Sequence, residues 1–74
     1  MNTENIHIFR SNIQTPADVA EVGIVLDIHP QIDSWTLDLH DDERILRVVS
    51  EKLTDRKITE LVALCGYQCE ELND

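Results

Sequence analysis

Residues 32–50 contain the pattern that most constrains the fold, because they read as two strands joined by a short polar turn. Trp35, Leu37 and Leu39 are separated by polar residues, and this two-residue period is typical of a strand with one buried face. A group of charged residues then interrupts the apolar pattern. Residues 45–49 follow as a run rich in β-branched side chains, which predicts a second strand. The stretch is therefore predicted to be a β-hairpin.

The segment before the hairpin carries the signals of a helix start. Thr15 suits the N-cap position, Pro16 the first helical position, and Asp18 the third position, where a capping-box acid belongs. An apolar stripe at helical spacing continues to about Ile28, and Pro30 then ends the helix. The stripe contains Val19, Val22 and Leu26, with Ala20, Gly23 and Val25 beside them.

A second helix is predicted after the hairpin, with Thr54 at its start. Leu53 and Ile58 stand at the two positions of a hydrophobic staple around that start. Gly66 is suited to the residue that follows a helix, where the left-handed conformation is common. The side chains expected to face the core recur at helical spacing and are Ile58, Leu61, Val62 and Cys65.

Two further strands complete the pattern, one at residues 6–13 and one at residues 67–72. The order is then β-α-β-β-α-β over a single domain of residues 1–74. Four strands with both helices on one face form the ferredoxin-like α+β sandwich, a four-stranded antiparallel sheet with right-handed crossovers. Fold analogy alone does not give a function.

The charge of the chain excludes some classes of partner. Its formal net charge is −9, so nucleic acid and anionic membrane surfaces would repel it, whereas a basic partner would not. No secretory leader or long apolar run is visible, and two cysteines are too few for a disulfide framework. We therefore expect a cytoplasmic protein with reduced thiols. No catalytic motif or glycine-rich phosphate loop is visible, so no enzymatic activity is expected.

Four stretches carry a resemblance to a known family. They are Asn12-Ile13-Gln14-Thr15, the strand at residues 32–39, Leu46-Arg47-Val48, and Cys65-Gly66-Tyr67 after the second helix. Together they resemble the heavy-metal-associated domain of copper chaperones and metal-transporting ATPases. That resemblance covers nearly the whole chain, implies the ferredoxin-like fold, and rests mostly on structural positions.

The metal-binding motif of that family is replaced in this sequence. The family's Met-Thr-Cys-x-x-Cys loop falls on residues 13–18, with Ile13 at the Met position and Thr15 and Asp18 at the two Cys positions. Both thiolates are missing, and Cu(I) is a soft ion that needs sulfur ligands. A hydroxyl and a carboxylate at this spacing predict a helix cap in preference to a relocated metal site. The resemblance also brings Tyr67 near this loop, where we expect it to pack.

Other side chains offer only weak alternatives for a metal ion. Cys65 and Cys69 lack the C-x-x-C spacing, and buried free cysteines behave as small apolar residues, so core thiols are preferred over a redox pair or a metal site. His40, among the acidic residues of the hairpin turn, lacks the spacing of a calcium loop, and we interpret that turn as solvated. Metal binding or trafficking through Cys65, Cys69 and Asp18 remains the alternative function.

The hairpin also predicts a surface for protein contacts. If its first strand faces the helices, then Ile45 and Val49 point to the opposite side of the sheet, and the family pattern places Ile6 and Ile8 there too. A slip of one residue in the first strand would instead bury Ile6 and Ile8, and the sequence does not decide between the two registers. The leading hypothesis is a small non-enzymatic binding protein that contacts a protein partner or a second copy of itself through this face.

Overall fold

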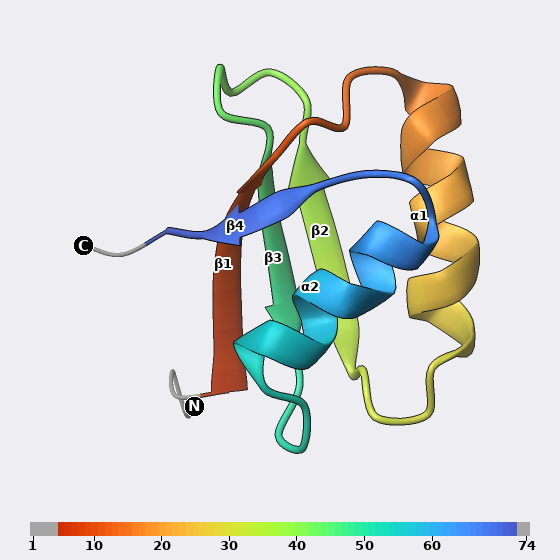
Figure 1. The fold of residues 1–74 in the computed structure, drawn as a ribbon, viewed down its shortest axis with the longest axis vertical. Coiled ribbons are helices and arrows are strands. Elements are labelled where there is room, and N and C mark those ends of the chain that lie inside the picture. The colour runs from red at the N-terminus through yellow and green to blue at the C-terminus, as the bar shows by residue number, and fades with distance from the viewer. Residues whose placement is uncertain (1–4, 73–74) are drawn as a thin grey trace.

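The structure is a computed structural model that describes residues 5–72, and its elements follow the predicted order (Figure 1). Each strand and helix lies within, or close to, the range that the sequence predicts for it. The elements are β1 (Ile6–Ser11), α1 (Pro16–Ile28), β2 (Ser34–Asp38), β3 (Ile45–Val49), α2 (Asp55–Leu64) and β4 (Cys69–Glu71).

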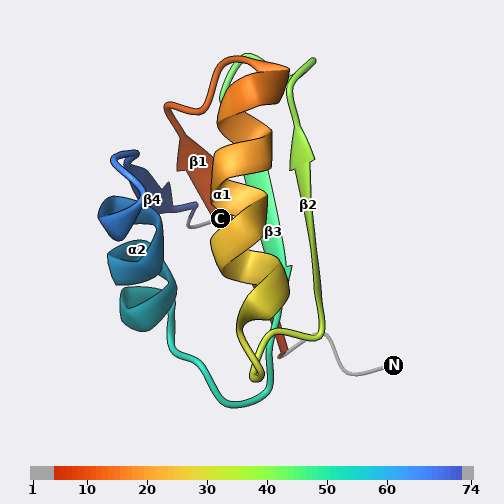
Figure 2. The same cartoon turned by 90° about the vertical axis from the view of Figure 1, so that its right-hand side faces the viewer.

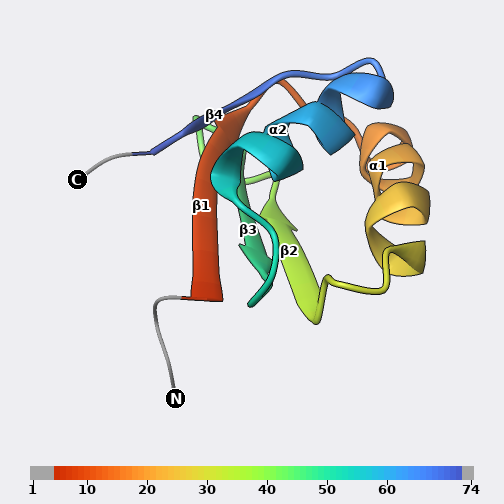
Figure 3. The same ribbon diagram turned by 60° about the horizontal axis from the view of Figure 1, so that its bottom comes forward.

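The four strands form one antiparallel sheet in the order β2-β3-β1-β4. Both helices lie on the same side of this sheet (Figure 2 and Figure 3). The chain therefore has the predicted ferredoxin-like architecture. We call the side of the sheet away from the helices the outer sheet face.

The core lies between the sheet and the two helices. Phe9 pairs with Leu46 across β1 and β3, and Leu46 pairs with Leu37 across β3 and β2, so these three side chains share the helix side of the sheet. Aliphatic residues fill most of the core, as expected for a chain with few aromatic residues. The buried cluster contains Phe9, Ile13, Val22, Leu26, Leu46, Val48, Leu53, Ile58 and Val62.

The predicted helix caps are present. The Thr15 hydroxyl accepts a hydrogen bond from Asp18 N, and the Asp18 carboxylate accepts one from Thr15 N, so both bonds of a capping box form at the start of α1. Thr54 caps α2 by accepting from Lys57 N at 3.1 Å. Gly66 follows α2 with a φ of +92°, in the left-handed region that favours glycine.

The register of β1 places Ile6 and Ile8 on the outer sheet face. Ile6 pairs with Val49 and Ile8 with Arg47, whereas His7 and Phe9 face the helices. The two nitrogens of the His7 imidazole contact the Asp55 carboxylate of α2 and, at 3.1 Å, the Ser50 carbonyl oxygen. These contacts hold β1 in this register.

The prediction that Ile45 is exposed on the outer sheet face is wrong. Ile45 lies on that face but is only 6% exposed. Since β3 lies between β2 and β1, side chains from both neighbouring strands can cover it. Ile6, Ile8 and Val49 on the same face are partly exposed.

The first and the last strand of the chain are shorter than predicted. β1 ends at Ser11, where the backbone leaves the strand ladder and Ser11 N donates to the Glu43 carbonyl of the hairpin turn. Ile13 lies beyond the strand but is fully buried. β4 covers only Cys69–Glu71, since the backbone of Tyr67 still bonds to the last turn of α2. None of the helices in the described residues is long and apolar enough to cross a membrane.

Candidate functional site

The loop between β1 and α1 is closed on itself by hydrogen bonds to Asp18. Asp18 Oδ2 accepts from Gln14 N and from Thr15 N, each at 3.2 Å, and Thr15 Oγ1 accepts from Asp18 N at 3.1 Å. Two side chains thereby satisfy three backbone N–H groups at the start of α1, which would otherwise lack intrahelical partners. Thr15 and Asp18 are therefore used for capping, as their residue types and spacing predict.

Tyr67 approaches this loop from the turn after α2. Its hydroxyl lies 2.8 Å from Asp18 Oδ1 and 2.7 Å from Glu21 Oε2. Because a phenol has a single proton, it donates to one carboxylate at a time. Glu21 was not singled out in the sequence, since it lies 46 positions from Tyr67 and no local pattern links them.

The contacts around Tyr67 favour the neutral phenol. The hydrogen bonds to Glu21 and Asp18, in that order of size, raise the pKa of Tyr67 because ionisation would remove the donated proton and add a third negative charge. The bond from Tyr67 lowers the pKa of the Asp18 carboxyl, and the bonds from Gln14 N and Thr15 N lower it further. The site therefore holds a neutral phenol against an ionised Asp18.

The side chains of the loop offer oxygen atoms as possible metal ligands and no sulfur atom. Ile13, at the position of the family's methionine, is fully buried in the core, and Thr15, Asp18 and Tyr67 offer a hydroxyl, a carboxylate and a phenol. Such groups suit hard cations better than Cu(I). Within residues 5–72, no group of three or more His, Cys, Asp and Glu side chains is arranged to hold a metal ion.

The two thiols are partly buried and do not bond to Asp18. Both are free cysteines: Cys65 Sγ donates to the Leu61 carbonyl at 3.4 Å, and Cys69 Sγ contacts Thr59 Oγ1 at 4.0 Å. Burial raises the pKa of the Cys65 thiol, and the negative charge of Glu21 adds to this effect. Burial also raises the pKa of Cys69. A protonated thiol is a poor nucleophile and a poor metal ligand, so these properties match core thiols.

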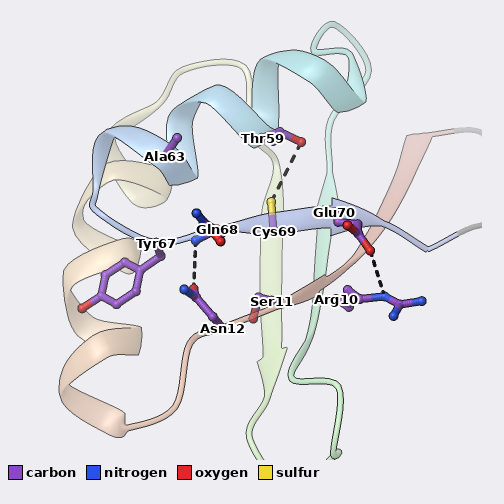
Figure 4. A pocket seen from close by; sticks show the side chains of 9 residues that line it. All are labelled: Arg10, Ser11, Asn12, Thr59, Ala63, Tyr67, Gln68, Cys69 and Glu70. Carbon is purple, nitrogen blue, oxygen red and sulfur yellow. Dashed lines mark hydrogen bonds and ion pairs between the residues drawn. The ribbon is translucent and has the colours of Figure 1, made fainter.

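A shallow depression of about 370 Å³ lies between β4, the end of β1 and α2 (Figure 4). Its polar groups pair across the depression: Asn12 Oδ1 accepts from Gln68 N at 2.8 Å, and Arg10 forms an ion pair with Glu70 at 3.5 Å. Cys69 contributes its thiol to the wall. No local pattern in the sequence predicts this depression, because its lining comes from three separate segments.

The largest exposed apolar side chains lie on the helices. Ile24 and Ile28 of α1 are 65% and 76% exposed, and Leu64 at the end of α2 is 82% exposed. The apolar stripe predicted for the core side of α1 extended to about Ile28, so an exposed apolar pair on this helix was not predicted. A signal was available, since Ile24 and Ile28 form a second apolar pair four residues apart on the other side of the same helix.

Comparisons with known proteins identify the fold but no sequence relative. No protein-family model matches the chain, and no curated protein sequence matches it. Among solved structures, the Cu(I)-loaded first domain of the human copper chaperone for SOD1 matches with a TM-score of 0.78 and 15% identity, covering 89% of each chain.

Two further matches come from yeast copper transport. The yeast copper transporter domain Ccc2a, solved in the apo and Cu(I)-loaded states, matches with a TM-score of 0.77 and 20% identity over 93% of this chain and 96% of that one. A structure of the Atx1–Cu(I)–Ccc2a complex matches with a TM-score of 0.78, at the same identity and coverage. The chain therefore has the βαββαβ fold of the heavy-metal-associated domains found in copper chaperones and copper transporters.

Proposed function

We propose that this chain is a non-enzymatic binding domain that acts through protein contacts, with the family's metal loop converted into a helix cap. The observation that carries this proposal is the closed loop at Asp18. Its carboxylate accepts from Gln14 N, Thr15 N and the Tyr67 hydroxyl, so its oxygens are already engaged within the chain. The solved Atx1–Cu(I)–Ccc2a complex, which contains a chain similar in fold to this one, supports protein contact as a use of the architecture.

The outer sheet face is the surface we propose for self-association. Its apolar residues Ile6, Ile8 and Val49 are partly exposed on two adjacent strands, and Ile45 lies buried beside them. Burying such side chains against a second sheet would remove apolar surface from water.

The charges on this face also favour contact between two copies. By strand register, Arg10 and Arg47 point outward together with Asp38 and Glu70, two positive and two negative residues. The face is therefore neutral, although the chain as a whole carries −9. Two copies can meet there without the repulsion that other parts of such an acidic surface would produce.

Sedimentation equilibrium with paired lysine variants tests the surface. Ile8→Lys with Val49→Lys adds two charges to the outer sheet face and should convert a concentration-dependent dimer into a monomer. The matched control, Ile24→Lys with Ile28→Lys, adds the same two charges to α1 on the other side of the molecule and should leave the dimer intact. Identical association of both variants and the native chain would contradict the proposed surface.

Anaerobic titration with Cu(I), Zn(II) and Ni(II) tests the conversion of the loop. The native chain should bind each ion no tighter than roughly millimolar, whereas Thr15→Cys with Asp18→Cys should bind Cu(I) far more tightly because it restores two soft ligands. Tight binding by the native chain would support the alternative function, metal trafficking. Loss of that binding in variants of Cys65, Cys69 or Asp18 would then identify the ligands.

The charge and the thiols of the chain bear on its partners and on its compartment. Its acidic charge favours a protein partner over nucleic acid or an anionic membrane. Its free and partly buried thiols are consistent with the cytoplasm, where cysteines stay reduced.

A further inference from the structure

Helix α1 has apolar residues on two opposite sides. One side, with Val22 and Leu26, is buried against the sheet and α2. The other side carries an outward stripe of exposed apolar residues at helical spacing, which we call the α1 stripe: Ala17, Ala20, Ile24 and Ile28. Figure 2 shows α1 in front, with no other element of the chain drawn between the helix and the viewer.

Folding alone does not account for the two isoleucines of the α1 stripe. Ile24 and Ile28 remain 65% and 76% exposed, so they contribute little to the core. Isoleucine also has a lower helix propensity than the long charged residues that normally occupy such positions, because its β-branch restricts χ1 in a helix. Their exposure therefore indicates a contact made outside the folded chain.

The charges around the α1 stripe indicate the sign of the charge on its partner. Every charged residue of α1 is acidic: Asp18, Glu21 and Asp27. The last turn has no basic residue to offset the negative end of the helix dipole. A second copy of this chain, with its net charge of −9, and an anionic membrane would both meet repulsion here, whereas a cationic segment would meet attraction.

We propose that the α1 stripe docks a cationic amphipathic helix of a partner protein, with the apolar side of that helix on Ile24 and Ile28 and its Lys or Arg residues beside Glu21 and Asp27. Apolar anchors at a spacing of one turn suit recognition of such a helix. The two isoleucine anchors are separate from the capped loop, since Ile24 and Ile28 lie six and ten residues beyond Asp18, about 9 and 15 Å along the helix. They are also separate from the outer sheet face.

Synthetic peptides test this proposal. A fluorescein-labelled helical peptide with a leucine stripe and a lysine polar face is titrated with the native chain and followed by anisotropy, and a peptide of the same length with a glutamate polar face serves as the charge control. The lysine peptide should bind, with an affinity that falls as salt rises, and the glutamate peptide should not. Equal binding of both peptides would overturn the inferred partner chemistry.

Two variants of equal charge separate the α1 stripe from general attraction to an acidic protein. Ile24→Gln with Ile28→Gln should weaken the binding of the lysine peptide by about tenfold or more, because two apolar contacts are lost. Leu64→Gln changes a side chain that is just as exposed but lies on α2, and it should leave the affinity unchanged. Equal affinities for all three proteins would show attraction by net charge alone and overturn the proposal. Neither variant changes the outer sheet face, so self-association measured in the same variants tests the proposed function independently of the peptide result.

Discussion

Replacing Gly23 by alanine tests how closely α1 and β2 approach each other. A Cβ at Gly23 would lie 2.9 Å from Trp35 Cζ2 and 3.2 Å from Trp35 Cη2, closer than side-chain carbons normally come. The indole has little freedom to move away, because Trp35 Nε1 donates to Asp27 Oδ1 at 2.7 Å and the ring packs against the core. The substitution therefore forces a shift of the ring or of the helix.

Two opposing effects determine the size of the change at Gly23. Alanine is better than glycine in a helix interior by about 1 kcal/mol. Adding a carbon to a tightly packed site costs about 1–3 kcal/mol. The free energy of unfolding should therefore fall by about 0–2 kcal/mol. In a Trp35→Phe background, where the two nearest ring atoms are gone, the same change should raise it by up to about 1 kcal/mol.

The double-mutant cycle of Gly23→Ala and Trp35→Phe isolates the contact. Urea unfolding followed by far-ultraviolet circular dichroism gives the four free energies without depending on Trp35 fluorescence. We expect a coupling energy of about 1–3 kcal/mol. Ala20→Gly, on the exposed side of the same helix, measures the propensity effect alone. Alanine at position 23 that stabilises both backgrounds equally would refute the close approach.

Two further predictions use groups whose titration the fold perturbs. Tyr67 is the single tyrosine, so ultraviolet titration should place its pKa above the ordinary value of about 10, and Asp18→Asn with Glu21→Gln should lower it again. Because folding raises the pKa of Tyr67, the stability that the phenol contributes is present below the unfolded pKa and is lost as pH rises through the folded pKa. A free energy of unfolding that does not change with pH over this range would contradict the prediction. Cys65 and Cys69 should react with iodoacetamide more slowly in the folded chain than in urea, because both thiol pKa values are raised, and equal rates by mass spectrometry would argue against it.

The parts of the fold that follow from local patterns were predictable from the sequence. The capping box at Thr15 and Asp18 depends on bonds that span only three residues, so residue type and spacing suffice to predict it. The bond between Tyr67 and Glu21 joins residues 46 positions apart and has no local signal. The resemblance brought Tyr67 to the loop, but it did not indicate the second carboxylate.

Periodicity predicts the side of an element but not what covers that side. The alternation in β3 correctly placed Ile45 on the outer sheet face, yet the neighbouring strands leave it only 6% exposed. In α1 the apolar stripe was predicted to continue to about Ile28, whereas Ile28 is exposed together with Ile24 one turn before it. The exposure of a side chain depends on neighbours that are distant in sequence. It can therefore be determined only when the packing of the helices and strands is known.

The distribution of charge separates the two proposed surfaces by the partner that each can accept. The outer sheet face balances Arg10 and Arg47 against Asp38 and Glu70, which permits a second copy of the same acidic chain. Helix α1 carries only acidic charge beside its exposed isoleucines, which disfavours a second copy and favours a cationic helix. A dimer formed through the sheet would leave both α1 stripes free, so the two contacts are compatible, and the dimer would present two docking sites to a bivalent partner.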